Sequence, residues 1–517
     1  MQISPDIQRS HRNRIGDAFD RSVRRNPQRL ALQYEARRWT YAQLQSGVNR
    51  VAHQLLALGL QTGDRVAAYA RNSDAYILLW LACAKTGLIH VPINYALLND
   101  ELRYIVEQSG AKALFHDAAL ADAIQALGDI PGCAWRGTLA EGQGTDILAW
   151  AEADGPESLP DADFSEAHIA QLLYTSGTTA APKGAMMSHR ALLAEYTSTL
   201  LALDIRAADR SLAALPLYHS AQMHVFVMPQ LLVGAATLLI QAPQAERCFE
   251  LIAGEGITSF FAPPTVWIAF LRHAAFDPAR LASLQKGYYG ASIMPVPIVQ
   301  ELAQRLPALQ LYNCYGQSEI APLATVLRPE DHAERPASAG RPIFNVETRI
   351  VDADLNDQPA GVMGEIVHRS PQLMSGYWNK PEETAAAFAG GWFHSGDVGH
   401  LDEAGYLYVT DRIKDIINTG GVVVASREVE ECLYTHPAVA EVAVIGLPDE
   451  RWIEAVTAVV ALKNGASASA GDLIAHVHER LAAFKVPKQV FFVEDMPRNA
   501  SGKLLKRTLR DRYSAAD

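Results

Sequence analysis

The segment from residue 174 to residue 196, YTSGTTAAPKGAMMSHRALLAEY, carries residue types that can bind a polyphosphate. Small residues let the backbone approach an anion closely, backbone N–H groups and hydroxyls donate hydrogen bonds, and a lysine adds positive charge. The donors are Thr175, Ser176, Gly177, Thr178, Thr179 and Lys183. This order of residues predicts a loop that grips the phosphates of ATP.

The loop differs from a Walker A motif, because GxxxxGK[ST] does not occur in the chain. A β-like run, AQLLY, enters the loop, and a helical pattern begins near Ser188. An ordinary Ser/Thr/Gly turn is the alternative interpretation of this segment alone.

Five further motifs lie C-terminal to the loop. They are LPLYHSAQMH (215–224), GYYGAS (287–292), LYNCYGQSEIAP (311–322), WFHSGD (392–397) and PRNASGKLLKR (497–507). Together with the loop they resemble the motifs of the adenylate-forming superfamily, which includes acyl- and aryl-CoA synthetases, peptide-synthetase adenylation domains and firefly-type luciferases. The resemblance covers roughly residues 16–510, and it is strongest to the bacterial fatty-acyl-CoA synthetases.

This resemblance implies a reaction in two steps. A carboxylic acid and ATP would form an acyl-AMP and pyrophosphate, and coenzyme A would then take the acyl group and release AMP. ATP and Mg²⁺ are the implied cofactors, and coenzyme A is the implied co-substrate.

The resemblance also assigns nucleotide contacts to positions of this chain. Tyr315 matches the aromatic residue that stacks on adenine, and Asp397 matches the residue that holds the ribose hydroxyls. The other matching positions are Gly290, Ala291, Asn313, Gly316, Ser318, Val409 and Arg412. Taken singly, a tyrosine is more often a packed ring, and an Asp after Gly is a common turn residue.

Four residues receive catalytic assignments by the same match. Glu319 matches a magnesium ligand, because a carboxylate beside a triphosphate needs a hard cation between them. Lys503 matches the lysine that reaches the reacting carboxylate and the α-phosphate, where negative charge accumulates. Thr175 belongs to the phosphate loop, and His219 lies where the family gates its acyl pocket. A gate and pocket wall is the favoured role of His219 over proton transfer.

The family is known to rotate its C-terminal domain between the two steps. By match, Lys414 is the hinge in DRIKD (411–415), and Gly420 and Gly421 lie on the face that serves coenzyme A. The chain departs from the family at Ala180, where Gly is usual, and at Val422 and Val423, where a polar pair is frequent. It also has Ser426 where Pro is frequent.

The sequence predicts two different patterns of secondary structure around these residues. Before about residue 340, apolar β-rich runs alternate with helical patterns, which predicts parallel βαβ units. The expected strands are 65–70, 112–116, 170–177, 258–264 and 286–292, and the expected helices are 101–110 and 296–306. The stretch 225–240 is expected to form a buried helix, a turn at Gly234 and a strand.

After about residue 340 the strands are short and separated by Gly-rich turns. They are expected at 347–356, 364–370 and 405–412, followed by helices at 429–436 and 473–484 and strands at 440–448 and 455–462. We therefore expect an α/β protein with a large N-terminal domain over 1–410, made of layered α/β structure and a small β-rich subdomain. A hinge at 411–415 and a small mobile α+β C-terminal domain over 416–517 complete the expectation.

Composition limits the class of protein. The chain has 517 residues, 49% of them hydrophobic and 20% charged, which is a globular balance and predicts more than one domain. The net charge of -12 argues against a nucleic-acid partner. Five scattered cysteines without a CxxC pair, and an N-terminus without an apolar core, favour a reduced cytoplasmic location. No transmembrane segment is expected, and a homodimer stays open.

The acid is expected to be apolar, because 221–228 and 288–295 contain no charged side chain. A medium- or long-chain fatty acid leads, and an aryl acid of the phenylpropanoid type is the alternative. An acyl-AMP ligase that loads a carrier protein, a luciferase-like oxygenase and a non-catalytic nucleotide sensor remain as other functions.

Overall fold

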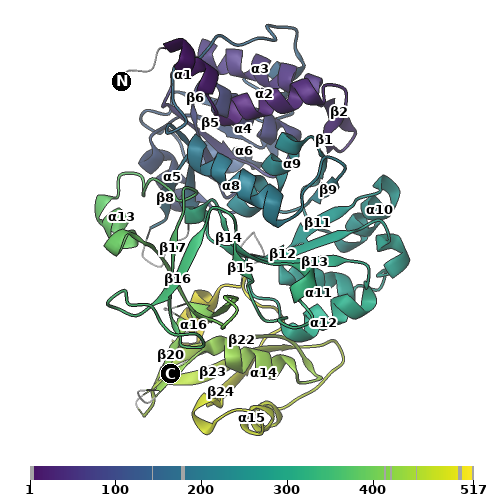
Figure 1. The fold of residues 1–517 in the computed structure, drawn as a ribbon, viewed down its shortest axis with the longest axis vertical. Coiled ribbons are helices and arrows are strands. Elements are labelled where there is room, and N and C mark those ends of the chain that lie inside the picture. The colour runs from purple at the N-terminus through teal and green to yellow at the C-terminus, as the bar shows by residue number, and fades with distance from the viewer. Residues whose placement is uncertain are drawn as a thin grey trace.

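The computed structural model describes residues 5–142, 144–175, 181–412, 415–419, 422–449, 451–498 and 504–514. The strands of this part of the chain form four sheets, and Figure 1 shows the C-terminal sheet, in yellow and green, below the others. No helix in these ranges has the length and apolar character that a membrane crossing requires.

The first sheet holds the strand that enters the predicted phosphate loop. Its order is β6-β5-β3-β4-β7-β8, with parallel pairing except between β7 and β8. The bounds are β3 (Arg65–Tyr69), β4 (Ile89–Ile93), β5 (Ala111–His116), β6 (Trp135–Thr138), β7 (Ile169–Thr175) and β8 (Lys183–Ser188). The side chains of β4 are all buried, as expected for a parallel strand that is covered on both faces.

The second sheet has the order β15-β14-β13-β12-β11-β9-β10-β1-β2. The central strands β13, β12, β11, β9, β10 and β1 pair in parallel. At the two ends of the sheet, β2 pairs antiparallel with β1, and β14 and β15 continue antiparallel from β13. The bounds are β1 (Leu30–Tyr34), β2 (Arg37–Thr40), β9 (Arg210–Ala213), β10 (Ala236–Leu239), β11 (Ser259–Ala262), β12 (Lys286–Gly290), β13 (Gln310–Gly316), β14 (Leu323–Leu327) and β15 (Arg341–Pro342).

Helices pack around both sheets, as Figure 1 shows for α3, α4, α8 and α10 to α12. The bounds are α1 (Pro5–His11), α2 (Ile15–Arg25), α3 (Tyr41–Ala57), α4 (Asp74–Thr86), α5 (Asn99–Ser109), α6 (Ala121–Ala126), α7 (Ile147–Glu152), α8 (His189–Ala202), α9 (Met228–Val233), α10 (Ala245–Glu255), α11 (Pro264–Arg272) and α12 (Val296–Arg305). Helix α8 begins as expected, because the Ser188 side chain accepts a hydrogen bond from the N–H of Ala191 and so caps the helix.

Two smaller sheets follow. The antiparallel sheet β16-β17-β18-β19 is the expected β-rich subdomain, with β16 (Glu347–Val351), β17 (Gly364–Arg369), β18 (Phe393–Leu401), β19 (Leu407–Arg412) and helix α13 (Pro381–Ala387). The C-terminal sheet contains β20 (Ile417–Thr419), β21 (Val422–Val424), β22 (Val439–Asp449), β23 (Ile453–Leu462) and β24 (Gln489–Phe492), with helices α14 (Ser426–Tyr434), α15 (Ala470–His478) and α16 (Lys506–Ser514). The expected α/β class is confirmed.

Most expected elements are present within a few residues of their predicted bounds. The stretch 225–240 is a π-helical turn (Ala221–Val227) that runs into α9, a left-handed turn at Gly234 with φ 95°, and strand β10. Helix 473–484 was predicted too long, since α15 ends at His478 and a separate 3₁₀ turn covers Ala483–Lys485. The N–H of Glu479 bonds to Ala475 and Val477 at this end, which closes the last turn.

Candidate active site

The two ends of the predicted phosphate loop lie side by side. Thr175 ends β7 and Lys183 begins β8, and the two are register partners in this antiparallel pair. A strand pair therefore brings a hydroxyl and an ammonium group to the same edge of the first sheet. Ser176, Gly177, Thr178, Thr179 and the departure at Ala180 lie outside the described residues.

Glu319 meets this edge from the second sheet. It lies in the 3₁₀ turn Ser318–Ile320 between β13 and β14, and its Oε1 accepts hydrogen bonds from Thr175 Oγ1 and from the Tyr377 hydroxyl, both at 3.1 Å. The Lys183 ammonium lies 4.9 Å from the centre of the Tyr377 ring, within the range of a cation–π contact. Thr175, Lys183 and Glu319 thus form one cluster with Tyr377 at its centre.

The neighbouring residue, Ser318, is hydrogen-bonded to the motif at 215–224. Ser318 Oγ is 2.9 Å from Ser220 Oγ, and Ser220 follows His219 directly. The half-buried His219 accepts a long hydrogen bond of 3.4 Å at Nδ1 from the N–H of Ala221. The structure therefore places His219 beside the Ser318–Glu319 turn, in the region predicted for a gate.

A second cluster surrounds Asp397. Asp397 is 4% exposed, and its Oδ2 accepts hydrogen bonds from the Tyr315 hydroxyl at 2.8 Å and from Gln317 Nε2 at 2.7 Å. Arg412 pairs with Asp397 across β18 and β19, and its Nε lies 3.1 Å from Oδ1. The Tyr315 ring packs against the apolar cluster that contains Val409. Asp397, Arg412, Tyr315 and Val409 are therefore brought together as predicted.

Backbone positions of β12 and β13 lie between these groups and leave little room. A Cβ atom on Gly290 would lie 2.2 Å from the carbonyl oxygen of Cys314, and one on Gly316 would lie 1.9 Å from that of Pro322. Ala291 has φ 64°, in the left-handed region, and it is exposed. Asn313 donates through Nδ2 to the carbonyl of Ser338 at 2.9 Å.

The remaining predicted residues cannot be placed. Lys503, the hinge residue Lys414, and Gly420 and Gly421 lie outside the described residues.

Comparison with known proteins bears on this arrangement. A family model described as AMP-binding enzyme matches residues 19–378, and a second, described as AMP-binding enzyme C-terminal domain, matches residues 428–503. The chain belongs to the AMP-binding enzyme family. It is an enzyme of the adenylate-forming superfamily, as the motifs indicated.

Similar proteins in this family span nearly the whole chain. A feruloyl-CoA synthase of Amycolatopsis sp is 36% identical over 493 residues, which cover 95% of this chain and 98% of that protein. The long-chain-fatty-acid–CoA ligase FadD13 of Mycobacterium tuberculosis is 35% identical over 485 residues, with coverage of 92% and 94%. The crystal structure of ATP-bound MatB from Rhodopseudomonas palustris superposes with a TM-score of 0.90 at 29% identity, covering 97% of this chain and 99% of that one.

The residues of this AMP-binding enzyme suit a magnesium ion that arrives with ATP. No group of three or more His, Cys, Asp and Glu side chains that could hold a metal occurs within the described ranges. Mg²⁺ is commonly bound through one or two carboxylates together with substrate phosphates and water. The single carboxylate of Glu319, oriented by two hydroxyl donors, fits that mode.

Electrostatics keep the two tyrosines of this site protonated. Burial, followed by the neighbouring Asp397, raises the pKa of Tyr315 well above its ordinary value. Burial and the adjacent Glu319 also raise the pKa of Tyr377. Both phenols therefore act as hydrogen-bond donors to a carboxylate at neutral pH.

Sequence reasoning missed Tyr377 and Gln317. Tyr377 follows Gly376, whose φ of 130° favours glycine, so the Gly-Tyr pair before the helix start at Pro381 was the available signal for a functional turn. Gln317 lies within the matched motif, but its side chain carries no charge and gave no signal of its own. It donates to both Asp397 and Tyr315.

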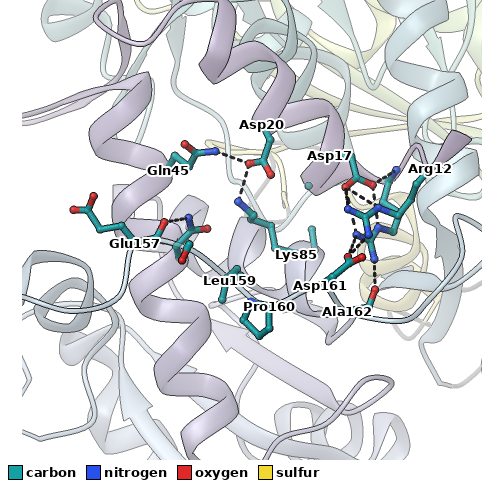
Figure 2. A pocket seen from close by; sticks show the side chains of 15 residues that line it. Arg12, Asp17, Asp20, Gln45, Lys85, Glu157, Leu159, Pro160, Asp161 and Ala162 are labelled. Carbon is teal, nitrogen blue, oxygen red and sulfur yellow. Dashed lines mark hydrogen bonds and ion pairs between the residues drawn. The ribbon is translucent and has the colours of Figure 1, made fainter. Parts of the chain in front are cut away.

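A separate cleft of about 350 Å³ is lined by residues of α2, α3, α4 and the segment 157–162, none of which belongs to the predicted site. Figure 2 shows Lys85 pointing toward Asp20, and Arg12 pointing toward Asp17 and Asp161. Lys85 Nζ lies 2.7 Å from Asp20 Oδ1, and Arg14 Nε lies 3.0 Å from Asp17 Oδ2. Because its cations are already paired with carboxylates, this cleft does not offer the free positive charge that a triphosphate needs.

Proposed function

We propose that this AMP-binding enzyme is an ATP-dependent acid–thiol ligase. It would join a carboxylic acid to AMP with release of pyrophosphate, and then transfer the acyl group to coenzyme A with release of AMP. The observation that supports this most is the segment from Tyr315 to Glu319. It meets Asp397 and Arg412 at one end and Thr175 and Lys183 at the other, so a nucleoside and a polyphosphate can be held along one short segment.

The first step would use these groups as follows. Tyr315, Asn313 and Asp397 hold the nucleoside, while Lys183, Thr175 and the phosphate loop hold the phosphates. Glu319 would hold Mg²⁺, which would reduce the negative charge of the triphosphate. Carboxylate oxygen attacks the α-phosphorus, the bond to the β-phosphate oxygen breaks, and pyrophosphate leaves with the electron pair. Lys503 is the residue that we assign to the charge that accumulates there.

The second step requires different groups at the same place. The domain boundaries at 1–410, 411–415 and 416–517, with Lys414 as the hinge, belong to this proposal. Gly420 and Gly421 would serve the transfer to coenzyme A, in which the thiolate attacks the acyl carbon and the bond to AMP breaks.

The acid is the finer part of the proposal. The expected pocket stretches meet through their aromatic side chains: Phe226 lies 4.4 Å from Phe261 and 5.0 Å from Tyr288 between ring centres, and Tyr288 lies 5.2 Å from Tyr312. We call these four residues the aromatic row. All four are at most 4% exposed, so the row fills the space between the π-helical turn Ala221–Val227 and β12. This packing supports a compact aryl acid, and the similarity to a feruloyl-CoA synthase agrees with it.

A medium- or long-chain fatty acid is the second candidate. The similarity to a long-chain-fatty-acid–CoA ligase supports it. The apolar character of the expected pocket also suits a fatty acid, because the stretches 221–228 and 288–295 contain no charged residue.

Pyrophosphate release from MgATP tests the function. We would measure it with a panel of hydroxycinnamates, benzoates and fatty acids, each with coenzyme A, with a phosphopantetheinylated carrier protein, and with neither. Multiple turnovers with coenzyme A support the ligase. Release limited to about one equivalent unless the carrier protein is present would point to a carrier-loading ligase, and no release with any acid would contradict the proposal.

Lys503→Ala separates the two steps. The variant should lose pyrophosphate release and still convert supplied acyl-AMP to acyl-CoA at a rate close to that of the unmodified enzyme. Equal loss of both steps would contradict the assignment of different residues to the two reactions.

A further inference from the structure

A buried carboxyl group, that of Glu195, hydrogen-bonds to the chain next to the turn that carries Ser318 and Glu319. Glu195 lies in α8 and is completely buried. Its Oε1 accepts a hydrogen bond at 3.2 Å from the backbone N–H of Leu323, which begins β14 three residues beyond the turn. A buried carboxyl group is costly unless its oxygens are satisfied, so the position of Glu195 requires a reason.

Gln372 completes the contact on the other side. Its Nε2 donates to Glu195 Oε2 at 2.6 Å and to the carbonyl of Leu323 at 3.0 Å, with a longer contact of 3.4 Å to the carbonyl of Ile320. Two residues farther on, the N–H of Met374 donates to the carbonyl of Glu319 at 2.8 Å. Glu195 and Gln372 therefore fix the backbone on the C-terminal side of Glu319.

The element that carries Glu195 is connected to the phosphate loop. Helix α8 starts one residue after β8, and β8 begins with Lys183. Glu195 thus joins the strand that bears the lysine to the turn that bears the carboxylate. A shift of α8 relative to the turn would change the position of Glu319 relative to Thr175 and Lys183.

We propose that Glu195 is a positioning residue for the magnesium–nucleotide site, acting through its hydrogen bonds to Leu323 and Gln372. This inference rests on the proposed ATP-dependent function. Glu195 has no contact with the predicted ligands themselves among its hydrogen-bond partners, which are Thr199, Leu323 and Gln372 in the described chain.

The chemistry of the site indicates which substitution should preserve the contact. Burial raises the pKa of Glu195 well above its ordinary value, although the Leu323 N–H, Thr199 and Gln372 act in the opposite direction. Two titratable groups that interact electrostatically with Glu195 are also uncharged at neutral pH. Burial raises the pKa of the Tyr196 phenol and of the Cys314 thiol. An amide has nearly the shape of a carboxyl group, so Glu195→Gln can keep an acceptor for the Leu323 N–H, but it places an amide nitrogen opposite the Gln372 Nε2 donor.

Calorimetric titration of the whole enzyme with ATP, without acid, tests the proposal in the presence of Mg²⁺ and in the presence of EDTA. Glu195→Ala should weaken MgATP binding about tenfold or more, as is usual when a group that orients a metal ligand is removed. ATP binding in EDTA should change much less. Glu195→Gln should weaken MgATP binding less than Glu195→Ala does, because it keeps the acceptor for the Leu323 N–H and loses only the contact with Gln372.

Thr199→Val is the matched control, because Thr199 Oγ1 donates to the same carboxyl group at 3.1 Å but does not hydrogen-bond to the turn in the described chain. It should leave MgATP binding unchanged. Should Glu195→Ala not fold, as judged by thermal unfolding, Gln372→Leu replaces it in the same titrations. A folded variant of either kind that binds MgATP as tightly as the unmodified enzyme would overturn the proposal, and so would equal losses with Mg²⁺ and with EDTA. An unmodified enzyme that binds no MgATP would instead contradict the proposed function.

Discussion

The Thr175 hydroxyl donates a hydrogen bond to Glu319 Oε1 at 3.1 Å, although 144 positions separate the two residues in the chain. This contact joins the edge of one sheet to the edge of the other. Tyr377 donates to the same oxygen and presents its ring to Lys183. The predicted metal ligand and the predicted phosphate lysine therefore share a neighbour that neither motif contains.

Tyr377→Phe should raise the KM for MgATP about fivefold, since the loss of one hydrogen bond to a carboxylate commonly costs about 1 kcal/mol or somewhat more. Tyr377→Leu should raise it further, because the cation–π contact with Lys183 is lost as well. Initial rates of pyrophosphate release at varied MgATP measure both. Tyr34→Phe, which removes a hydroxyl on β1, is the control and should change nothing. A Tyr377→Phe enzyme with an unchanged KM would contradict this role.

Asp397→Ala should weaken ATP binding more than Arg412→Ala does. Three side chains converge on Asp397, so its removal leaves Tyr315, Gln317 and Arg412 without their common acceptor. Arg412→Ala leaves Asp397 held by two donors, and we expect a loss of about tenfold, equivalent to about 1.4 kcal/mol. Equilibrium titration with ATP checks the order. Arg349→Ala, at an exposed pair with Asp357, is the control.

Gly290→Ala should destabilise the second sheet. The new Cβ would lie 2.2 Å from a backbone oxygen of β13, which forces the strands apart at a cost of about 1–3 kcal/mol. Gly254→Ala in α10 has no heavy atom within 4 Å of the new Cβ and should instead raise stability by about 0.5–1 kcal/mol. Urea unfolding midpoints measure both. Equal midpoints for the two variants would refute the steric argument.

Stability should fall as the pH is lowered below about 6.5. Burial lowers the pKa of His90, His189 and His224 to about 3, and for His224 the neighbouring His90 adds to this effect. The unfolded chain binds a proton at each histidine near pH 6.5 and the folded chain does not, so the stabilisation is complete above that pH and is lost as the pH falls toward 3. Each such histidine lowers the free energy of unfolding by about 2 kcal/mol when the pH falls from 6.5 to 5.

Urea unfolding at pH 7 and pH 5 measures this loss. His224→Gln should reduce the difference between the two pH values, because one of the buried groups that resist protonation is gone. The same midpoint at both pH values in the unmodified enzyme would contradict the prediction.

The aromatic row predicts how the acid preference responds to mutation. Phe226→Ala should open space beside Tyr288 and raise kcat/KM for dodecanoate relative to a hydroxycinnamate, by about tenfold or more. The substitution also costs about 3–5 kcal/mol of stability, so Phe226→Leu is the milder companion and thermal unfolding is measured for both. An unchanged ratio in two folded variants would show that the row does not limit the acid.

The sequence predicted those features that local patterns encode. The hydroxyl-rich entry to β8 was recognisable because close backbone approach to an anion needs small residues, whereas the glycines of β12 and β13 were assigned by their resemblance to family motifs. Periodicity located β3, β5 and α12 within a residue at each end. The division of roles between Lys503 and Gly420 stays a prediction, since both lie outside the described residues.

Other relationships could not be predicted, because their partners are distant in the chain and chemically unremarkable. Gln372 bonds to Glu195 across 177 positions, and Tyr377 to Glu319 across 58. An uncharged amide or phenol in a loop gives no periodic signal. A glutamate in a helix is usually exposed, so nothing in the pattern of α8 indicated that Glu195 is buried.

Helix α14 has a feature that bears on domain rotation. Its N-cap residue, Ala425, makes no side-chain cap, and the carboxylate of Asp411 accepts hydrogen bonds from the N–H and Oγ of Ser426 at 2.8 and 2.6 Å. The helix is therefore capped by the first residue of the predicted hinge at 411–415. A rotation of the C-terminal part about the predicted hinge would uncap its own helix and break these two hydrogen bonds to the carboxylate. The time that the C-terminal part spends in this orientation should therefore depend on the Asp411–Ser426 contacts, together with the hydrogen bond from Arg427 to the carbonyl of Val409.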